Sequence, residues 1–280
     1  MVNKKKIIYI AEIGLNHNGS LDLAKKHIEK AKESGATIAK FQTYKTRKRA
    51  KANSPIFEIL KQCELSIDDF FELKNFCKEN EITFSSTPFC EESAVELNNI
   101  GCEIFKIASF HLRNLKLIER IITLENCKKL IISTGVSSSL DLLSANNLYD
   151  SINLKSKPDL TFLHCVSEYP ISNFLNYNLA NIPFIKQITS KQVGFSDHTI
   201  GSLTPSYAVA LGAEIIEKHF TIDNKLEGAD HAMSANPNVF KEMVNNCNNF
   251  LDMVGERRLN SHYDCEKNSL QFCSNDTNNN

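Results

Sequence analysis

The 280-residue sequence has no excess of charge of either sign and no long apolar run. Its 32 lysines and arginines nearly balance its 33 aspartates and glutamates, which argues against non-specific nucleic-acid binding and adhesion to acidic membranes. No run of eighteen apolar residues occurs, so no segment is expected to span a bilayer. The apolar stretch Ile7–Ala11 is too short for a signal peptide and leads into Glu12. We therefore expect a cytoplasmic protein.

Closely spaced cysteine pairs are also missing. The nine cysteines lie far apart along the chain, and no C-x-x-C motif occurs. A zinc ribbon or a disulfide framework would need closer pairs. We therefore expect most of these cysteines to be small buried residues with reduced thiols.

Short β-branched runs alternate with amphipathic stretches along most of the chain. Each of eight predicted strands is followed by a segment whose apolar residues recur at helical spacing. In the first helix, Ser20 is expected to cap the start and Gly35 to close the end. The last helix is predicted from Pro237 to Met253. The predicted strands are Ile7–Ile13, Ala36–Gln42, Glu81–Thr87, Cys102–Ser109, Lys129–Thr134, Asp159–Val166, Lys191–Ser196 and Ala213–Phe220.

The strand starts recur about every 30 residues, which is the size of a βα unit. Eight such units predict an α/β fold, a closed (β/α)8 TIM barrel over residues 1–255, and such barrels typically need about 250 residues. A doubly wound open sheet is the alternative, but it would need a glycine-rich phosphate turn after the first strand. The segment Glu12–Gly19 does not have that form. We therefore predict the barrel, followed by a polar and poorly ordered tail over residues 256–280.

One segment does not fit the repeat. Thr43–Leu65 is a long excursion after the second predicted strand, and it opens with the basic run Lys45–Lys51. Such a run is usually a solvated charged loop. The alternative is that it helps to gather an anionic substrate, since loops at this end of a barrel often carry function.

Polar side chains stand at the carboxyl end of every predicted strand. Charged side chains would cost several kcal/mol each if they were buried there without partners. In a TIM barrel all these ends meet on one rim, where the active site is built. The residues concerned are Glu12, Lys40, Gln42, Ser86, Thr87, Lys106, Ser109, Ser133, Thr134, His164, Ser196, His198, Glu217 and His219.

Alternation along the last two strands places chemically related groups on one face. Ser196 and His198 share a face, as do Glu217 and His219. Because neighbouring strands lie about 5 Å apart, His198 and His219 could converge on one metal ion, with Asp230 nearby.

Two lysines on different strands, Lys40 and Lys106, stand among hydroxyl side chains and the loop amides after Gly135. This mixture of cations, hydroxyls and a histidine pair suits a small phosphorylated molecule. The adjacent His164 and Cys165 point to opposite faces of a strand, so they do not form a nucleophile–base pair.

Ten short segments are distinctive enough to indicate a family. The chain resembles the N-acetylneuraminate (sialic acid) synthase family, whose members make nonulosonic acids. The matching segments occur in the family's order and cover roughly residues 7–245. They are Ala11–Ser20, Ala39–Thr43, Ser86–Phe89, Phe105–Ser109, Ser133–Gly135, Leu163–Pro170, Gly194–Thr199, Ala210–Ala213, Ile216–Thr221 and Gly228–His231.

The resemblance implies a (β/α)8 enzyme that condenses phosphoenolpyruvate with an N-acylated hexose-type sugar such as N-acetylmannosamine and uses a divalent metal, Mn²⁺ or Mg²⁺. It also implies that the product serves a cell-surface polysaccharide. Carried over by motif, the phosphoenolpyruvate-binding residues are Lys40, Thr87, Lys106, Ser109, Ser133 and Ser196. The metal ligands are His198 and His219, and the sugar-binding residues are Gln42, Asn53, Tyr169 and Asp230. Glu12 would handle protons near the reacting carbons, and Glu217 would support the metal site.

The chain departs from the family pattern in two places. Typical members continue into a small antifreeze-like domain that, in a dimer, reaches the partner's active site, and nothing after Gly255 resembles it. A more open sugar site, a homodimer or a separate partner protein is therefore expected. Phe110 and His111 stand where many members have Gly or Asp followed by an acid, so His111 could change specificity or weaken proton handling.

Two further functions remain open. One is a non-catalytic barrel that binds a sugar or a partner synthase. The other is a related phosphoenolpyruvate-dependent synthase acting on a phosphorylated aldose, although such relatives lack the motifs that carry His198 and His219. Manganese binding separates the synthase from the binding module, because a binding module has no need of the metal.

Overall fold

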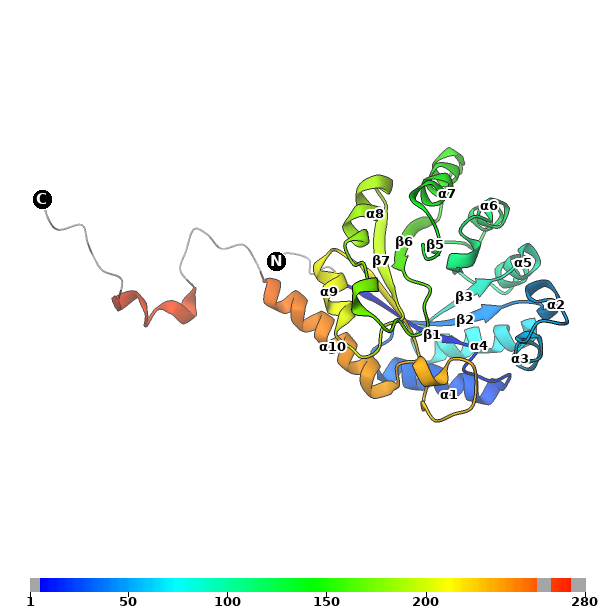
Figure 1. The fold of residues 1–280 in the computed structure, drawn as a ribbon, viewed down its shortest axis with the longest axis horizontal. Coiled ribbons are helices and arrows are strands. Elements are labelled where there is room, and N and C mark those ends of the chain that lie inside the picture. The colour runs from blue at the N-terminus through cyan, green and yellow to red at the C-terminus, as the bar shows by residue number, and fades with distance from the viewer. Residues whose placement is uncertain (1–5, 256–262, 273–280) are drawn as a thin grey trace, which may run out of the picture.

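The computed structural model describes residues 6–255 and 263–272. Eight parallel strands form a closed barrel in which each strand pairs with the next in the chain, and the first strand pairs with the eighth (Figure 1). The predicted (β/α)8 barrel is therefore confirmed. The strands are β1 (Ile8–Gly14), β2 (Ile38–Thr43), β3 (Thr83–Pro88), β4 (Ile104–Ile107), β5 (Lys129–Ser133), β6 (Asp159–Cys165), β7 (Gln192–Asp197) and β8 (Ile215–His219).

Helices surround the strands (Figure 1). The α-helices are α1 (Leu21–Glu33), α2 (Thr46–Arg49), α3 (Phe57–Gln62), α4 (Ile67–Glu79), α5 (Glu91–Asn99), α6 (Leu115–Ile122), α7 (Ser139–Ser151), α8 (Asn181–Thr189), α9 (Thr204–Ala210) and α10 (Pro237–Val254). The short 3₁₀ helices are η1 (Ser109–His111), η2 (Phe174–Asn176), η3 (His231–Met233), η4 (Asp264–Glu266) and η5 (Leu270–Phe272). As predicted, the Ser20 side chain caps α1, where it accepts a hydrogen bond from the Leu23 amide.

Two predicted segments differ from the structure. The fourth strand is shorter than predicted, because Ser109 already begins the helical turn η1. The excursion after β2 is not simply a solvated loop, since it contains α2 and α3 and is anchored by a small apolar cluster. That cluster consists of Leu15, Tyr44, Leu60 and Cys63.

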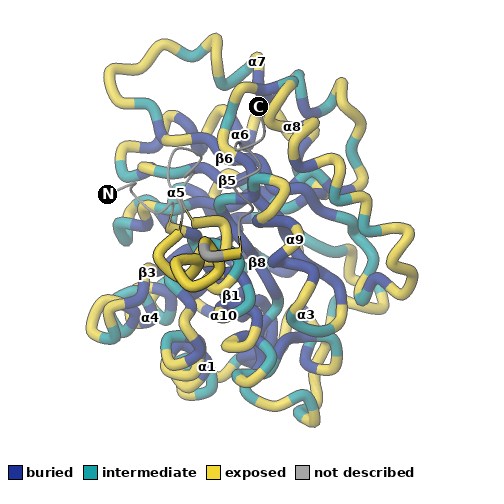
Figure 2. The backbone as a smooth tube through the Cα atoms, turned by 90° about the vertical axis from the view of Figure 1, so that its left-hand side faces the viewer, coloured by how far each residue is buried: buried dark blue, intermediate teal, exposed yellow. Residues whose placement is uncertain are grey.

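The strands separate two apolar regions. Outward-facing side chains such as Phe41, Phe105 and Phe162 are fully buried and pack against the helices in the larger cluster. Inward-facing side chains form a second cluster inside the barrel, built on Ile10, Ile38, Ile131, Leu163 and Ile215. In Figure 2 the strands are accordingly dark blue, whereas the surrounding helices and loops carry most of the exposed yellow positions.

Gly194 on β7 faces this inner cluster at a point where the barrel is narrow. A Cβ atom there would lie 2.4 Å from the carbonyl oxygen of Ile215 and 2.5 Å from Cδ2 of Leu163. Any side chain larger than hydrogen would force backbone apart, so the Leu163 side chain occupies this space alone.

The predicted tail, 256–280, lies partly outside the described residues. Within it, 263–272 contains η4 and η5, and its described side chains are exposed. Residues 256–262 and 273–280 lie outside the described ranges. The eight cysteines within those ranges all have free thiols, and six of them are buried, as the sequence predicted. Within the same ranges, no helix combines the length and the apolar character that crossing a membrane requires.

Candidate active site

A cavity of about 240 Å³ opens at the carboxyl ends of the strands. Of the fourteen predicted site residues, thirteen line it, and they come from strands or loops all around the barrel. The exception is Asn53, which is exposed between α2 and α3 and does not line the cavity. Eleven of the fourteen rim residues expected from strand periodicity line this cavity. Ser86, Thr134 and His164 do not, because successive side chains alternate between the two faces of a strand and these three follow the inward-facing Ser85, Ser133 and Leu163.

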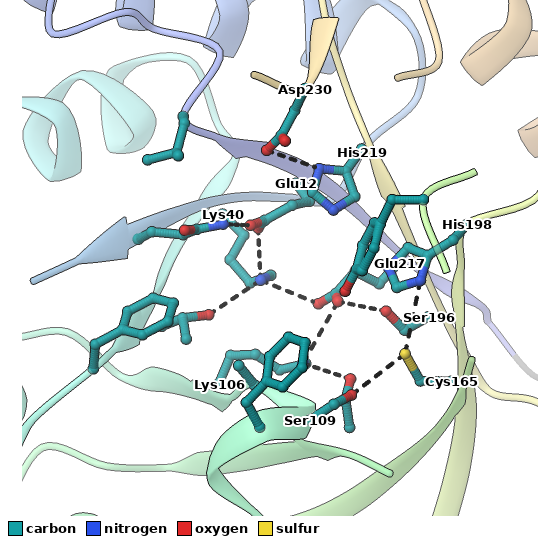
Figure 3. Close-up of a pocket in the computed structure, with 18 of the residues that line it drawn as sticks. Glu12, Lys40, Lys106, Ser109, Cys165, Ser196, His198, Glu217, His219 and Asp230 are labelled. Carbon is teal, nitrogen blue, oxygen red and sulfur yellow. Dashed lines mark hydrogen bonds and ion pairs between the residues drawn. The ribbon is translucent and has the colours of Figure 1, made fainter. Parts of the chain in front are cut away.

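Two lysines and two carboxylates that line this cavity form a buried ionic network (Figure 3). Lys40 Nζ lies 2.6 Å from Glu12 Oε2 and 3.4 Å from Glu217 Oε2. Lys106 Nζ lies 3.5 Å from Glu217 Oε1. All four side chains are at most 7% exposed, so each charge depends on its partners rather than on water.

The network decides the protonation state of Glu217. Burial raises the pKa of this carboxyl, but Lys106 and Lys40 outweigh burial and lower it to about 2. Burial likewise lowers the pKa of Lys40, and the charges of Glu12 and Glu217 reverse that effect and raise it. Glu217 is therefore an anion that keeps cationic Lys40 stable inside the barrel.

Both lysines donate hydrogen bonds to hydroxyl side chains that line the cavity. Lys40 Nζ donates to Thr87 Oγ1 at 3.2 Å, and Lys106 Nζ donates to Ser133 Oγ at 2.6 Å. Ser196 Oγ donates to Glu217 Oε1 at 2.9 Å. Several donors thus converge from neighbouring strands, which is the arrangement that binds phosphate and carboxylate oxygens.

The two histidines predicted as metal ligands lie together, with ring centroids 5.6 Å apart. His198 Nδ1 is 2.7 Å from the Val166 carbonyl oxygen, so it donates there and leaves Nε2 free to coordinate. His219 Nδ1 is buried without a hydrogen-bond partner, 3.7 Å from Asp230 Oδ2. The imidazole pair therefore fits a divalent cation.

The histidine pair would leave coordination positions open. Within residues 6–255 and 263–272, no three His, Cys, Asp or Glu side chains are arranged to hold a metal ion. The protein would therefore supply two imidazoles, and water or substrate oxygens would complete the coordination sphere.

A buried ion pair lies behind the two histidines. Lys218 Nζ is 2.6 Å from Asp197 Oδ2 and 2.5 Å from the Thr199 carbonyl oxygen, and both charged side chains are at most 3% exposed. Asp197 directly precedes His198, and Lys218 directly precedes His219. The pair therefore ties together the two strand ends that carry the imidazoles, a contact that the sequence analysis missed.

Three of the four residues predicted to bind the sugar, Gln42, Tyr169 and Asp230, line the cavity. Gln42 Nε2 donates to Glu12 Oε1 at 2.8 Å, while Gln42 Oε1 is buried without a partner. The Tyr169 ring lies 4.1 Å from the His198 ring, centroid to centroid. Unsatisfied polar atoms beside an aromatic face are typical of a small-molecule site.

Cys165 also faces the cavity. As predicted, it points away from His164, whose Nε2 lies 2.8 Å from the Tyr177 carbonyl oxygen. Its Sγ instead lies 3.9 Å from His198 Nδ1 and 3.4 Å from Ser109 Oγ. Strand alternation could have located it, because Cys165 follows inward-facing Leu163 by two residues.

Arg49 was not singled out by the sequence analysis, although it belongs to the basic run whose role was left open. It is the only member of that run to line the cavity among the described residues. Its guanidinium Cζ lies 3.7 Å from the Phe89 ring centroid and 4.5 Å from that of Tyr44. His111 is close by, with its ring 5.3 Å from Phe89, and burial and then the Arg49 charge lower its pKa.

Known proteins resemble this chain over most of its length. The NeuB family model matches residues 27–258. MJ1065, an uncharacterized protein of Methanocaldococcus jannaschii, is 42% identical over 88% of this chain and 71% of its own length. The N,N'-diacetyllegionaminic acid synthase of Campylobacter jejuni is 38% identical over 90% of this chain and 78% of its own.

A solved structure gives the same result for the fold. The N-acetylneuraminic acid synthetase of Leptospira borgpetersenii, crystallised in complex with citrate, superposes with a TM-score of 0.86. It is 33% identical in sequence, and the match covers 97% of this chain and 94% of that one. The likeness therefore extends over the whole barrel.

Proposed function

The chain belongs to the NeuB family, and we propose on that premise that it is a nonulosonic acid synthase. In the proposed reaction it condenses phosphoenolpyruvate with an N-acylated hexose-type sugar and releases inorganic phosphate. A bond forms between C3 of phosphoenolpyruvate and the sugar's aldehyde carbon. Water then adds at C2, and the bond from C2 to the phosphate oxygen breaks.

One observation carries the proposal. Two buried lysines, their hydroxyl partners and a pair of imidazoles share a single cavity of about 240 Å³. Lysines with converging hydroxyls suit the phosphate and carboxylate of phosphoenolpyruvate. The imidazole pair suits a cation that a carbonyl oxygen can approach. Both reactants of a condensation would thus be held side by side, which is the main requirement of a bimolecular step.

Lys40 and Lys106 would bind the anionic donor. In the structure, Glu217 and Glu12 occupy their ammonium groups. An arriving phosphate would accept hydrogen bonds from Lys40 and Thr87. The ammonium group of Lys40 is already shielded from water by the barrel. Electrostatic contacts of this kind are strongest in an enclosed, pre-organised site.

Glu12 would accept the proton of the water that adds at C2. Its carboxylate is oriented by Gln42 through Oε1 and by Lys40 through Oε2. Those two contacts hold the side chain in one rotamer beside the lysine that would bind the donor. A general base must lie within hydrogen-bond reach of the proton that it accepts, and the contacts to both carboxylate oxygens fix the position of Glu12.

His198 and His219 would hold the divalent cation, Mn²⁺ or Mg²⁺. When bound, the cation would polarise the sugar carbonyl as a Lewis acid. Tyr169 shields one side of the His198 ring, and Asp230 lies beside His219. These neighbours would keep both rings oriented toward the cavity.

The experiment that tests the proposal is phosphate release from phosphoenolpyruvate in the presence of manganese. N-acetylmannosamine and 6-deoxy-diacetamido hexoses are supplied in parallel reactions. We expect release that depends both on one sugar and on the metal. The His198→Ala variant should release phosphate at least about a hundredfold more slowly.

Two outcomes would contradict the proposal. No release with any of these sugars, together with no binding of phosphoenolpyruvate, would leave the non-catalytic barrel as the better description. Unchanged release by His198→Ala would show that the histidine pair does not serve the reaction. The matched control is His164→Ala, which changes a histidine whose side chain faces away from the cavity.

A further inference from the structure

Arg49 lies at the end of the short helix α2, and its side chain reaches the active-site cavity. The guanidinium Cζ is 3.7 Å from the Phe89 ring centroid and 4.5 Å from that of Tyr44. Contact with aromatic faces stabilises a partly desolvated guanidinium and fixes its plane. The donors along its edge are then free to face a ligand.

The other residues of the basic run Lys45–Lys51 do not line the cavity, and two of its lysines form ion pairs elsewhere. Lys45 pairs with Glu96 at 3.0 Å, and Lys48 pairs with Glu92. Arg49, by contrast, has no carboxylate within ion-pair distance among the described residues, and its Nη1 is buried without a hydrogen-bond partner. A buried donor without a partner costs about 1–3 kcal/mol, so Nη1 is a candidate for ligand binding.

Phe89 places Arg49 closer to the mouth of the barrel than Lys40 and Lys106. The Phe89 amide donates to the Thr43 carbonyl oxygen at 3.0 Å, so strand pairing continues beyond β3. Phe89 therefore shares a face with Thr87, about 7 Å closer to the mouth of the barrel. Since Thr87 contacts Lys40, Arg49 lies above the layer that would bind phosphoenolpyruvate.

The charges of the cavity show what Arg49 would bind. Three basic side chains, Lys40, Arg49 and Lys106, line it together with three carboxyl side chains, Glu12, Glu217 and Asp230, and burial lowers the pKa of Lys106, so the cavity carries no excess positive charge. Lys40 and Lys106 are already paired with carboxylates in the buried network. Binding of the trianionic phosphoenolpyruvate would therefore leave the side chains of the cavity and the donor together with an excess of negative charge. Arg49 as donor and Asp230 as acceptor then suit a polyhydroxylated molecule without charge of its own.

We propose that Arg49 binds the acceptor and determines its specificity, by donating hydrogen bonds from its edge to a hydroxyl or acyl oxygen of an uncharged sugar. This assignment rests on the proposed synthase function, because that function supplies the acceptor. The stacking of Arg49 on Phe89 and Tyr44 positions the donors. A lysine at the same place would keep the charge but lose the planar fork.

The test compares Arg49→Met and Arg49→Lys with Arg47→Met. Arg47 lies in the same helix and carries the same charge, but it is exposed and does not line the cavity. We expect Arg49→Met to raise the KM for N-acetylmannosamine about tenfold to a hundredfold. The KM for phosphoenolpyruvate should change less than about threefold. Arg49→Lys should give an intermediate effect, and Arg47→Met should match the wild type.

Direct titration of each variant with N-acetylmannosamine in a calorimeter separates this proposal from the proposed function. If the wild type binds the sugar and Arg49→Met binds it at least tenfold more weakly, Arg49 is upheld even if no phosphate is ever released. If the wild type does not bind the sugar, or Arg49→Met binds it equally well, the assignment is overturned. Thermal unfolding of all three variants checks that they fold.

Two kinetic outcomes would also overturn the proposal. A rise in the KM for phosphoenolpyruvate as large as that for the sugar would place Arg49 in the donor site. A preference for N-acetylmannosamine 6-phosphate over N-acetylmannosamine, lost in Arg49→Met, would mean that Arg49 reads a phosphate on the acceptor.

Discussion

The barrel interior has two layers that differ in chemistry although they lie two residues apart on the same strands. The lower layer is apolar and the upper layer is mostly polar or charged. Along β1, Ile10 is followed by Glu12, and along β2, Ile38 is followed by Lys40. On β8 the pair is Ile215 and Glu217.

This difference shows how the barrel keeps charges reactive. The side chains of the lower layer are buried and pack against one another next to the ionic network. Charges in an enclosed, low-dielectric site act on one another and on a ligand more strongly than they would in water. The apolar layer therefore contributes to binding without touching the ligand, and the two layers should respond differently to mutation.

The largest effect is expected in the upper layer, from Lys40→Met. This variant removes the ammonium group that lies nearest to Glu12 and leaves two buried carboxylates without it. We expect phosphate release to fall about a thousandfold and phosphoenolpyruvate binding to weaken. Lys40→Arg keeps the charge and should retain more affinity. Wild-type affinity for phosphoenolpyruvate in Lys40→Met, measured by calorimetry, would contradict the role of this layer.

A second prediction concerns Lys218 and Asp197, which lie at the height of the upper layer but point away from the cavity. Lys218→Met leaves Asp197 buried without its partner, which should reduce the free energy of unfolding by about 3–5 kcal/mol. Urea denaturation measures the loss. The double variant Asp197→Asn/Lys218→Met should recover part of it, because no buried charge is left unpaired. A loss below 1 kcal/mol in Lys218→Met would show that Asp197 finds another partner.

The lower layer is tested by Leu163→Ala, with Cys165→Ala two residues along the same strand as its control. Leu163 is fully buried and fills the space beside Gly194, so the variant leaves a cavity. We expect it to lower the free energy of unfolding by about 2–5 kcal/mol and to leave the KM values near those of the wild type. Cys165→Ala removes one atom and should cost less than about 1.5 kcal/mol. Equal losses in urea denaturation would mean that the two layers do not differ.

The smallest effect is a pH dependence that only the upper layer can produce. Because Lys106 and Lys40 outweigh burial, the pKa of Glu217 falls from 4.5 to about 2 on folding. The carboxylate therefore stabilises the fold above pH 4.5, and this contribution is lost as the pH falls toward 2. We expect a loss on the order of 2–3 kcal/mol across that interval. Glu217→Gln should flatten this part of the stability profile, and an unchanged profile in that variant would refute the assignment.

The layers also show which features the sequence could reveal. The eightfold recurrence of strand and helix predicted the barrel, because a βα unit has a characteristic length. Alternation predicted that His198 and His219 share a site and that Cys165 faces away from His164. Asn53 was assigned to the sugar site by motif alone, and the structure leaves it exposed outside the cavity. Loop alignment carries no periodicity, so nothing in the sequence corrected that assignment.

The sequence alone determined the fold, the rim on which polar groups gather and the family, because these depend on local periodicity and on short contiguous motifs. Only the tertiary structure decided which charges are partners. Glu217 holds two lysines from β2 and β4, Lys218 holds Asp197 behind the histidines, and Arg49 stacks on Phe89 at the mouth. Such contacts join residues far apart in the chain, and their strength depends on burial, which exists only after the barrel has closed.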